Sequence, residues 1–165
     1  QLSPRAEALL YAADRAEHVA SVIRPALARG AVVITDRYVD SSLAYQGAGR
    51  DLSMGEVERL SSFATSGLKP DLTVLLDVRV EDGLARTSLR DASPDRLERE
   101  SVEFHQTVRD AFRELANTAP DRYLVVDASL AAETIHRIIV DRLEPVVPPA
   151  VGAPRTTAPI KISRR

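Results

Sequence analysis

Apolar residues recur every three or four positions between Arg5 and Arg29. They are Leu9, Leu10, Ala13, Ala16, Ala20, Ile23 and Leu27. This spacing predicts a long helix with one buried face. Gly30 supplies the usual stop, and Pro25 is expected to kink or loosen the helix near its end.

Three short apolar runs have a different pattern, which is typical of buried strands. They occupy residues 31–35, 72–78 and 122–127. Helical patterns cover residues 53–65, 80–90, 97–117 and 131–143, and the first of these begins at Ser53 in the form of a capping box. Strands that alternate with helices predict an α/β fold with a parallel sheet and right-handed crossovers.

The composition fits one globular domain. The chain has 165 residues, 44% of them hydrophobic, and a net charge of -2, so it lacks the broad positive field of a nucleic-acid-binding protein. It contains no cysteine, which excludes disulfides and cysteine-ligated metals and suits the cytoplasm. No apolar run approaches the roughly 20 residues that cross a bilayer.

Prolines interrupt every regular pattern after Glu144. We therefore expect residues 1–143 to form the domain and residues 144–165 to form a disordered tail.

The most informative segment follows the first predicted strand. It reads Asp36-Arg37-Tyr38-Val39-Asp40-Ser41-Ser42-Leu43-Ala44-Tyr45-Gln46-Gly47. Ligands of open α/β sheets bind outside the carboxyl ends of the strands, so Asp36 and Arg37 are predicted to lie at the mouth of a binding crevice.

Together with the helical stretch from Glu7 to Arg15, this segment resembles the bacterial thymidylate kinases, which phosphorylate dTMP to dTDP. The resemblance runs from about Ser3 to about Leu143 and covers most of the chain. It implies a three-layer phosphate-loop kinase fold with a parallel sheet, dTMP and ATP as substrates, Mg2+ as the metal, a homodimer and a cytoplasmic location.

One part of the family pattern does not occur in these residues. The family's phosphate loop, Gly-x-x-x-x-Gly-Lys-Ser/Thr, is absent from the sequence. In the family, the strand before that loop lies between those matched by residues 32–35 and 72–78. We therefore expect a fragment of a kinase that is inactive on its own and, with two strands left unpaired, aggregation-prone or molten.

By the same resemblance, the catalytic roles fall on Asp36, Arg37 and Arg90. Arg37 would bind the acceptor phosphate through a planar pair of hydrogen bonds, and Asp36 would orient Arg37 and hold Mg2+ through water. The alternatives are an ion pair of Arg37 with Asp36 or Asp40, and a turn cap for Asp36.

The resemblance places the nucleoside against residues from both segments. Tyr11 would stack on thymine, and Arg15, on the same helix face, would reach the base or its phosphate. Tyr45 would crowd the sugar and disfavour a 2′-hydroxyl. The other members of the dTMP-binding set are Ser41 and Ser42, which would read the thymine edge, and Gln46. The alternative for Tyr11 is ordinary packing.

Three arginines on either side of Pro94 correspond to the family's lid, which contacts ATP. They are Arg86, Arg90 and Arg96. Arg90 is our choice for the charge that closes on the transferring phosphoryl group. For the other two, a solvated charged helix face is the alternative.

The remaining candidate groups have less specific patterns. Asp77, at the end of the second predicted strand, is either an acid that contacts magnesium through water or a strand terminator. The histidines, His18, His105 and His136, lack metal-ligand spacing and are expected to be solvent-exposed.

Two rival functions stay open at this point. One is a related kinase with another nucleoside or nucleotide acceptor. The other is a catalytically dead nucleotide-binding or interaction module of a larger fused protein. A phosphate loop encoded upstream would favour the enzyme over the module.

Overall fold

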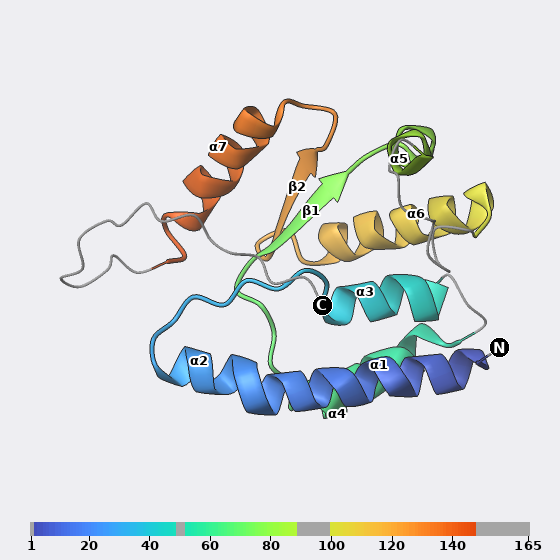
Figure 1. Ribbon diagram of the computed structural model, residues 1–165, viewed down its shortest axis with the longest axis vertical. Helices are drawn as coiled ribbons and strands as arrows, with labels where there is room; N and C mark the ends of the chain where they lie inside the picture. The colour runs from blue at the N-terminus through green and yellow to red at the C-terminus, as the bar shows by residue number, and fades with distance from the viewer. Residues whose placement is uncertain (1, 49–51, 89–99, 148–165) are drawn as a thin grey trace.

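The computed structural model describes residues 2–48, 52–88 and 100–147. Helix α1 (Pro4–His18) continues through the π-helical segment η1 (Val19–Ile23) into α2 (Arg24–Ala28), so the long helix expected here is confirmed (Figure 1). It begins where the Ser3 hydroxyl accepts a hydrogen bond from the Ala6 amide at 3.3 Å. The wide turn of η1 ends two residues before Pro25, which lies in the first turn of α2. Because proline has no backbone amide to donate to the preceding turn and its ring crowds that turn, the widening there agrees with the predicted loosening of the helix.

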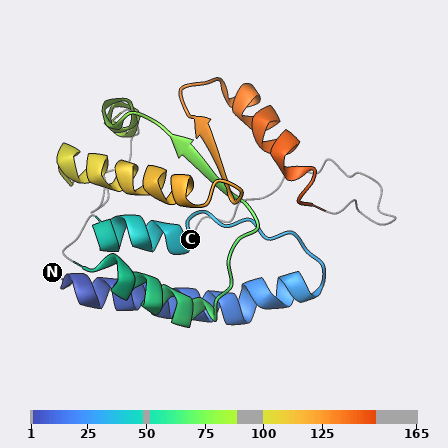
Figure 2. The same ribbon diagram turned by 180° about the vertical axis from the view of Figure 1, so that it is seen from behind.

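The described sheet consists of two parallel strands, β1 (Thr73–Asp77) and β2 (Tyr123–Asp127). Thr73 lies opposite Tyr123, and Asp77 lies opposite Asp127. Helix α7 (Ala132–Leu143) packs on β2, while α6 (Val102–Thr118) contacts both strands and α5 (Val80–Ser88) (Figures 1 and 2). The predicted α/β class with a parallel sheet is therefore confirmed.

The strand predicted at residues 31–35 is wrong for this structure. The segment runs without regular secondary structure from the turn after α2, with Val32 and Ile34 59% and 78% exposed. A strand needs a neighbour that accepts and donates its backbone hydrogen bonds. Among the described residues, no strand lies beside this segment.

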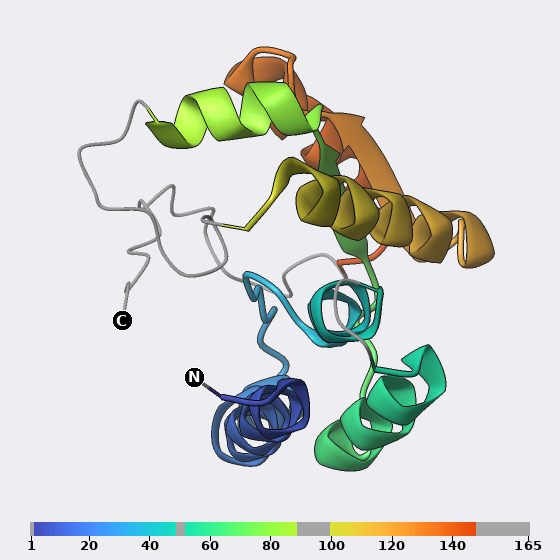
Figure 3. The same cartoon turned by 90° about the vertical axis from the view of Figure 1, so that its right-hand side faces the viewer.

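The segment after Tyr38 is enclosed between two helical layers. It forms α3 (Val39–Ser42) and then η2 (Leu43–Ala48), which packs against α6 on one side and α4 (Met54–Thr65) on the other (Figure 3). Ala44 of η2 is fully buried against Val108 and Ala111 of α6. Gly47 lies so close to the Met54 sulfur that a Cβ atom there would collide with it.

Two local predictions need correction. Ser53 does precede α4, but its side chain makes no cap hydrogen bond, and the Glu56 carboxylate lies 3.6 Å from the Arg5 guanidinium instead. His105 was expected to be solvent-exposed, yet it is partly buried beside Phe104, and its Nε2 atom has no hydrogen-bond partner among the described residues.

The predicted tail falls largely outside the described residues, which end at Val147. None of the helices in the described ranges has the length and apolar character that a membrane-spanning helix requires.

Candidate nucleotide site

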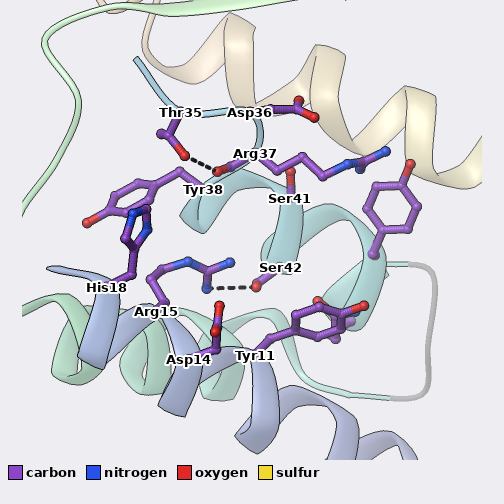
Figure 4. A pocket seen from close by; sticks show the side chains of 12 residues that line it. Tyr11, Asp14, Arg15, His18, Thr35, Asp36, Arg37, Tyr38, Ser41 and Ser42 are labelled. Carbon is purple, nitrogen blue, oxygen red and sulfur yellow. Dashed lines mark hydrogen bonds between the residues drawn. The ribbon is translucent and has the colours of Figure 1, made fainter. Parts of the chain in front are cut away.

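A cavity of about 310 Å³ opens between α1 and the segment from Thr35 to Gln46 (Figure 4). It is lined by Tyr11, Asp14, Arg15, His18, Thr35, Asp36, Arg37, Tyr38, Ser41, Ser42, Tyr45 and Gln46. All seven residues that we had assigned to dTMP binding lie in this lining, as does Asp36. The structure therefore brings together two segments that the sequence analysis had connected only by resemblance.

The α1 side of the cavity carries Tyr11 and Arg15 on one helix face. The Arg15 guanidinium donates to the Ser42 hydroxyl at 3.0 Å and lies 5.7 Å from the centre of the Tyr38 ring. Burial lowers the pKa of Arg15, and the fields of Tyr38 and nearby carboxylates partly oppose this shift. A guanidinium nevertheless stays protonated at neutral pH, so Arg15 supplies positive charge to the cavity.

The opposite side presents Arg37 in an unusual backbone conformation. Its φ angle is 67°, in the left-handed region, and the Thr35 hydroxyl donates to its carbonyl oxygen at 3.2 Å. Such conformations cost about 1–3 kcal/mol and concentrate at functional sites. Here the turn aims the guanidinium across the Tyr45 ring, 4.9 Å from its centre.

Asp40, one of the two carboxylates considered as an ion-pair partner of Arg37, is bound by an arginine directly before β2. Its two carboxylate oxygens accept hydrogen bonds from Arg122, at 2.9 and 3.0 Å. The sequence analysis missed Arg122, because it lies 82 residues from Asp40 and outside every motif.

Gln46 lines the cavity, but its amide group is engaged on the other side. The amide nitrogen donates to a carboxylate oxygen of Glu7 at 3.1 Å, and both residues are buried. A buried carboxylate is stable only with hydrogen-bond donors around it, so this contact ties η2 to α1. Its position suits a supporting role better than direct nucleotide contact.

Four lining residues were not assigned to the site from the sequence. They are Asp14, His18, Thr35 and Tyr38. Asp14 and His18 lie three and seven positions after Tyr11, so helical spacing was an available signal. The Tyr38 hydroxyl donates to the Leu68 carbonyl at 3.3 Å, and burial raises the pKa of Tyr38.

The predicted lid lies mostly outside the described residues, and neither Arg90 nor Arg96 can be placed. Arg86, on α5, donates to the Ala128 carbonyl at 3.1 Å, in the turn after β2. Asp77 accepts two hydrogen bonds from Arg109, at 2.7 and 3.0 Å, and these bonds lower the pKa of Asp77. Asp77, at the end of β1, is therefore held by an arginine of α6.

The cavity offers oxygen donors of the kind that Mg2+ prefers. The carboxylates of Asp14 and Asp36 and the nearby serine hydroxyls all line it. Within the described ranges, no group of three or more metal-ligating side chains occurs. One or two carboxylates completed by substrate phosphates are usual for Mg2+, so the residues present fit that ion.

Comparison with known proteins identifies the family. The family model described as thymidylate kinase matches residues 1–139. A thymidylate kinase of Clavibacter michiganensis subsp. michiganensis is 54% identical over 152 residues, which are 92% of this chain and 71% of that protein. One from Leifsonia xyli subsp. xyli is 57% identical over 143 residues, 87% of this chain and 68% of that protein.

A solved structure agrees with the fold. The thymidylate kinase of Ehrlichia chaffeensis superimposes with a TM-score of 0.67 at 27% identity, covering 87% of this chain and 66% of that one. The chain thus spans about two thirds of the length of these proteins. On this sequence similarity and shared fold, the chain belongs to the thymidylate kinase family, a family of phosphotransferases.

Proposed function

We propose that this chain supplies the acceptor-nucleotide site of a dTMP kinase, which transfers the γ-phosphoryl group of ATP to dTMP. The observation that carries the proposal is the convergence in one cavity of two guanidinium groups, three exposed or half-buried tyrosine rings and a pair of serine hydroxyls. A nucleoside monophosphate needs all three kinds of group: charge for its phosphate, a flat surface for its base and hydrogen bonds for the base edge.

The roles proposed from the resemblance are compatible with the positions of the side chains in the cavity. Arg37, raised towards the cavity by its left-handed turn, binds the acceptor phosphate, and Asp36 beside it orients that contact. Tyr11 offers its ring to thymine, while the Arg15–Ser42 pair presents polar atoms to the base edge. Tyr45 narrows the space beside the sugar and disfavours a 2′-hydroxyl.

The transfer itself requires positioning and charge more than covalent chemistry. A phosphate oxygen of dTMP attacks the γ-phosphorus of ATP, the bond to the β–γ bridging oxygen breaks, and ADP and dTDP result. Mg2+, held through water by Asp36, would supply positive charge to the phosphates when bound. The lid arginines Arg86, Arg90 and Arg96 are proposed to add charge on closure, with Arg90 nearest the transferred group.

The ATP side of the reaction needs a phosphate-binding loop, and the 165 residues contain no Gly-x-x-x-x-Gly-Lys-Ser/Thr sequence. We therefore propose that these residues by themselves bind dTMP but do not transfer phosphate. The homodimer and the cytoplasmic location follow from the resemblance alone and stay predictions.

Titration calorimetry of the 165-residue chain with dTMP tests the site directly. Arg37→Ala is expected to weaken dTMP binding by about 10- to 100-fold, because charge-assisted hydrogen bonds contribute about 1.5–3 kcal/mol. Arg137→Ala on the exposed surface of α7 is the matched control, and should leave the affinity unchanged.

Phosphate transfer is measured on the full-length product of the gene, with dTMP, dUMP and deoxynucleosides compared as acceptors. A clear preference for any acceptor other than dTMP would replace the substrate proposed here. Binding of dTMP without turnover in the full-length product would instead identify a catalytically dead nucleotide-binding module.

A further inference from the structure

We infer that Arg122 is a positioning residue for the nucleotide cavity, acting through Asp40 to fix the orientation of the helix formed by residues 39–48. This inference rests on the proposed function, since it concerns how the same site is held. Arg122 is not part of the cavity lining. Its influence must therefore pass through the residues that it binds.

The contact between Arg122 and Asp40 has the geometry of a directional clamp. Both oxygens of Asp40 accept hydrogen bonds from the guanidinium, at 2.9 and 3.0 Å, and the two side chains are only 25% and 10% exposed. A planar, two-pronged pair fixes the angle between its partners as well as their distance.

Arg122 is itself held at the start of the sheet. Its guanidinium donates to the Thr73 hydroxyl at 2.9 Å, and its carbonyl oxygen accepts from the Thr73 amide at 2.8 Å. The guanidinium also lies 4.6 Å from the centre of the Tyr123 ring. Because Thr73 begins β1 and Tyr123 begins β2, the clamp ties Asp40 to the first residues of both strands.

The helix that carries Asp40 needs such an outside anchor. Its α-helical part has only four residues, and Tyr38 provides no side-chain cap at its start. A helix this short has little stability of its own and takes its orientation from tertiary contacts. The packing of Ala44 against α6 fixes how closely residues 39–48 approach that helix. The contact of Arg122 with Asp40, in the first turn, restricts rotation of residues 39–48 about their helix axis.

Rotation matters here because cavity residues follow Asp40 directly. Ser41 and Ser42 are the next two residues, and Tyr45 lies five positions after Asp40 on the same helical segment. The hydrogen bond from Arg15 to Ser42 is 3.0 Å long, so a rotation that moved Ser42 by an ångström would break it. Arg122 therefore sets the positions of the serine hydroxyls and the Tyr45 ring relative to α1.

Arg122→Lys tests the inference, because lysine keeps the charge but cannot form the two-pronged bond. In the full-length kinase, KM for dTMP is expected to rise about tenfold, with kcat within about twofold and KM for ATP unchanged. In the ligand-free 165-residue chain, amide hydrogen exchange of residues 39–48 should become faster, while that of α7 should not.

Arg109→Lys is the matched control. It removes a two-pronged pair of similar burial, Arg109 with Asp77, whose side chains are 23% and 19% exposed. It should lower thermal stability by a similar amount to Arg122→Lys but leave KM for dTMP within about twofold. Asp40→Asn should reproduce Arg122→Lys, and the double variant should be no worse than either single one, because both remove the same contact.

If Arg122→Lys lowers stability as the control does and changes neither KM for dTMP nor exchange at residues 39–48, Arg122 is merely structural and the inference is wrong. A wild-type kinase that does not accept dTMP would instead refute the proposed function. In that case, the exchange comparison on the ligand-free chain still decides whether Arg122 orients the helix.

Discussion

Residues 31–35 and residues 73–77 have nearly the same pattern of apolar residues, but only the second segment forms a strand. Each is a short run rich in β-branched and aliphatic residues that leads to an aspartate, Asp36 after the first and Asp77 at the end of the second. The second forms β1 and pairs with β2 along its full length, whereas the first has no regular secondary structure, pairs with no strand among the described residues and is largely exposed. A residue pattern thus gives a segment the capacity to be a strand, and a neighbouring backbone decides whether it becomes one.

The aspartates at the ends of these two segments also differ in their surroundings. Asp77 is held by Arg109, while Asp36 lies in the wall of the cavity. The segment without a sheet partner is therefore also the one that leads into the proposed site, and its geometry depends on turns and side-chain contacts.

Proline substitutions should separate the two segments most strongly. The Thr73 amide donates to the Arg122 carbonyl, on the side of β2. In a parallel pair every second residue of a strand points its amide to the same neighbour, so the Leu75 amide also faces β2 and donates to it. Leu75→Pro should therefore destabilise the 165-residue chain by about 3 kcal/mol or more. Val33→Pro should cost less than about 0.5 kcal/mol, since its amide has no backbone partner among the described residues. Urea denaturation followed by circular dichroism measures both.

A large loss of stability from Val33→Pro in the 165-residue chain would show that residues 31–35 are paired in solution. In the full-length product, the same substitution should become costly if a further strand pairs with this segment, as the family resemblance implies.

The aspartates give a smaller, pH-dependent difference. Two hydrogen bonds from Arg109 hold the pKa of Asp77 below its ordinary value, so its contribution to stability is present above about pH 4, the unfolded pKa, and is lost as pH falls through the lower folded pKa. Asp77→Asn should cost about 1 kcal/mol at pH 7, and this cost should shrink as pH falls through the lowered folded pKa of Asp77. Asp36→Asn is the paired variant and should change unfolding by less than about 0.5 kcal/mol at pH 7 and below.

Urea unfolding midpoints from pH 2 to 7 provide the measurement. An Asp77→Asn penalty that stayed constant across this range would mean that the ion pair contributes through shape alone and not through charge.

The smallest effect is expected from polar substitution of exposed apolar side chains. Ile34 and Leu76 are 78% and 50% exposed. Ile34→Thr should change the free energy of unfolding by less than about 0.5 kcal/mol, and Leu76→Thr by about 1 kcal/mol, because Leu76 still covers part of the paired sheet. Ile34→Thr should nevertheless raise the soluble fraction of the chain, since it removes an apolar side chain from an unpaired extended segment. Light scattering during a thermal ramp would detect this, and equal aggregation of the variant and the parent chain would count against it.

Much of the architecture was predictable because its determinants are local. Helical spacing and the stop at Gly30 located the helix of residues 4–28, and continuous apolar runs located β1 and β2. The segment from Asp36 to Gln46, together with Tyr11 and Arg15, was sufficient to predict the family and the residues that now line one cavity.

The amino-acid sequence by itself therefore determined the other helices, two strands, the fold class and the family, but not the helical segment of residues 39–48. Only the tertiary structure decided which groups meet: Arg15 with Ser42, Gln46 with Glu7 and Arg122 with Asp40, which are 27, 39 and 82 residues apart. It also decided that residues 31–35 stay unpaired and that Arg37 adopts a left-handed turn. Periodicity and turn signals act over a few residues, whereas these contacts depend on how whole elements pack in three dimensions.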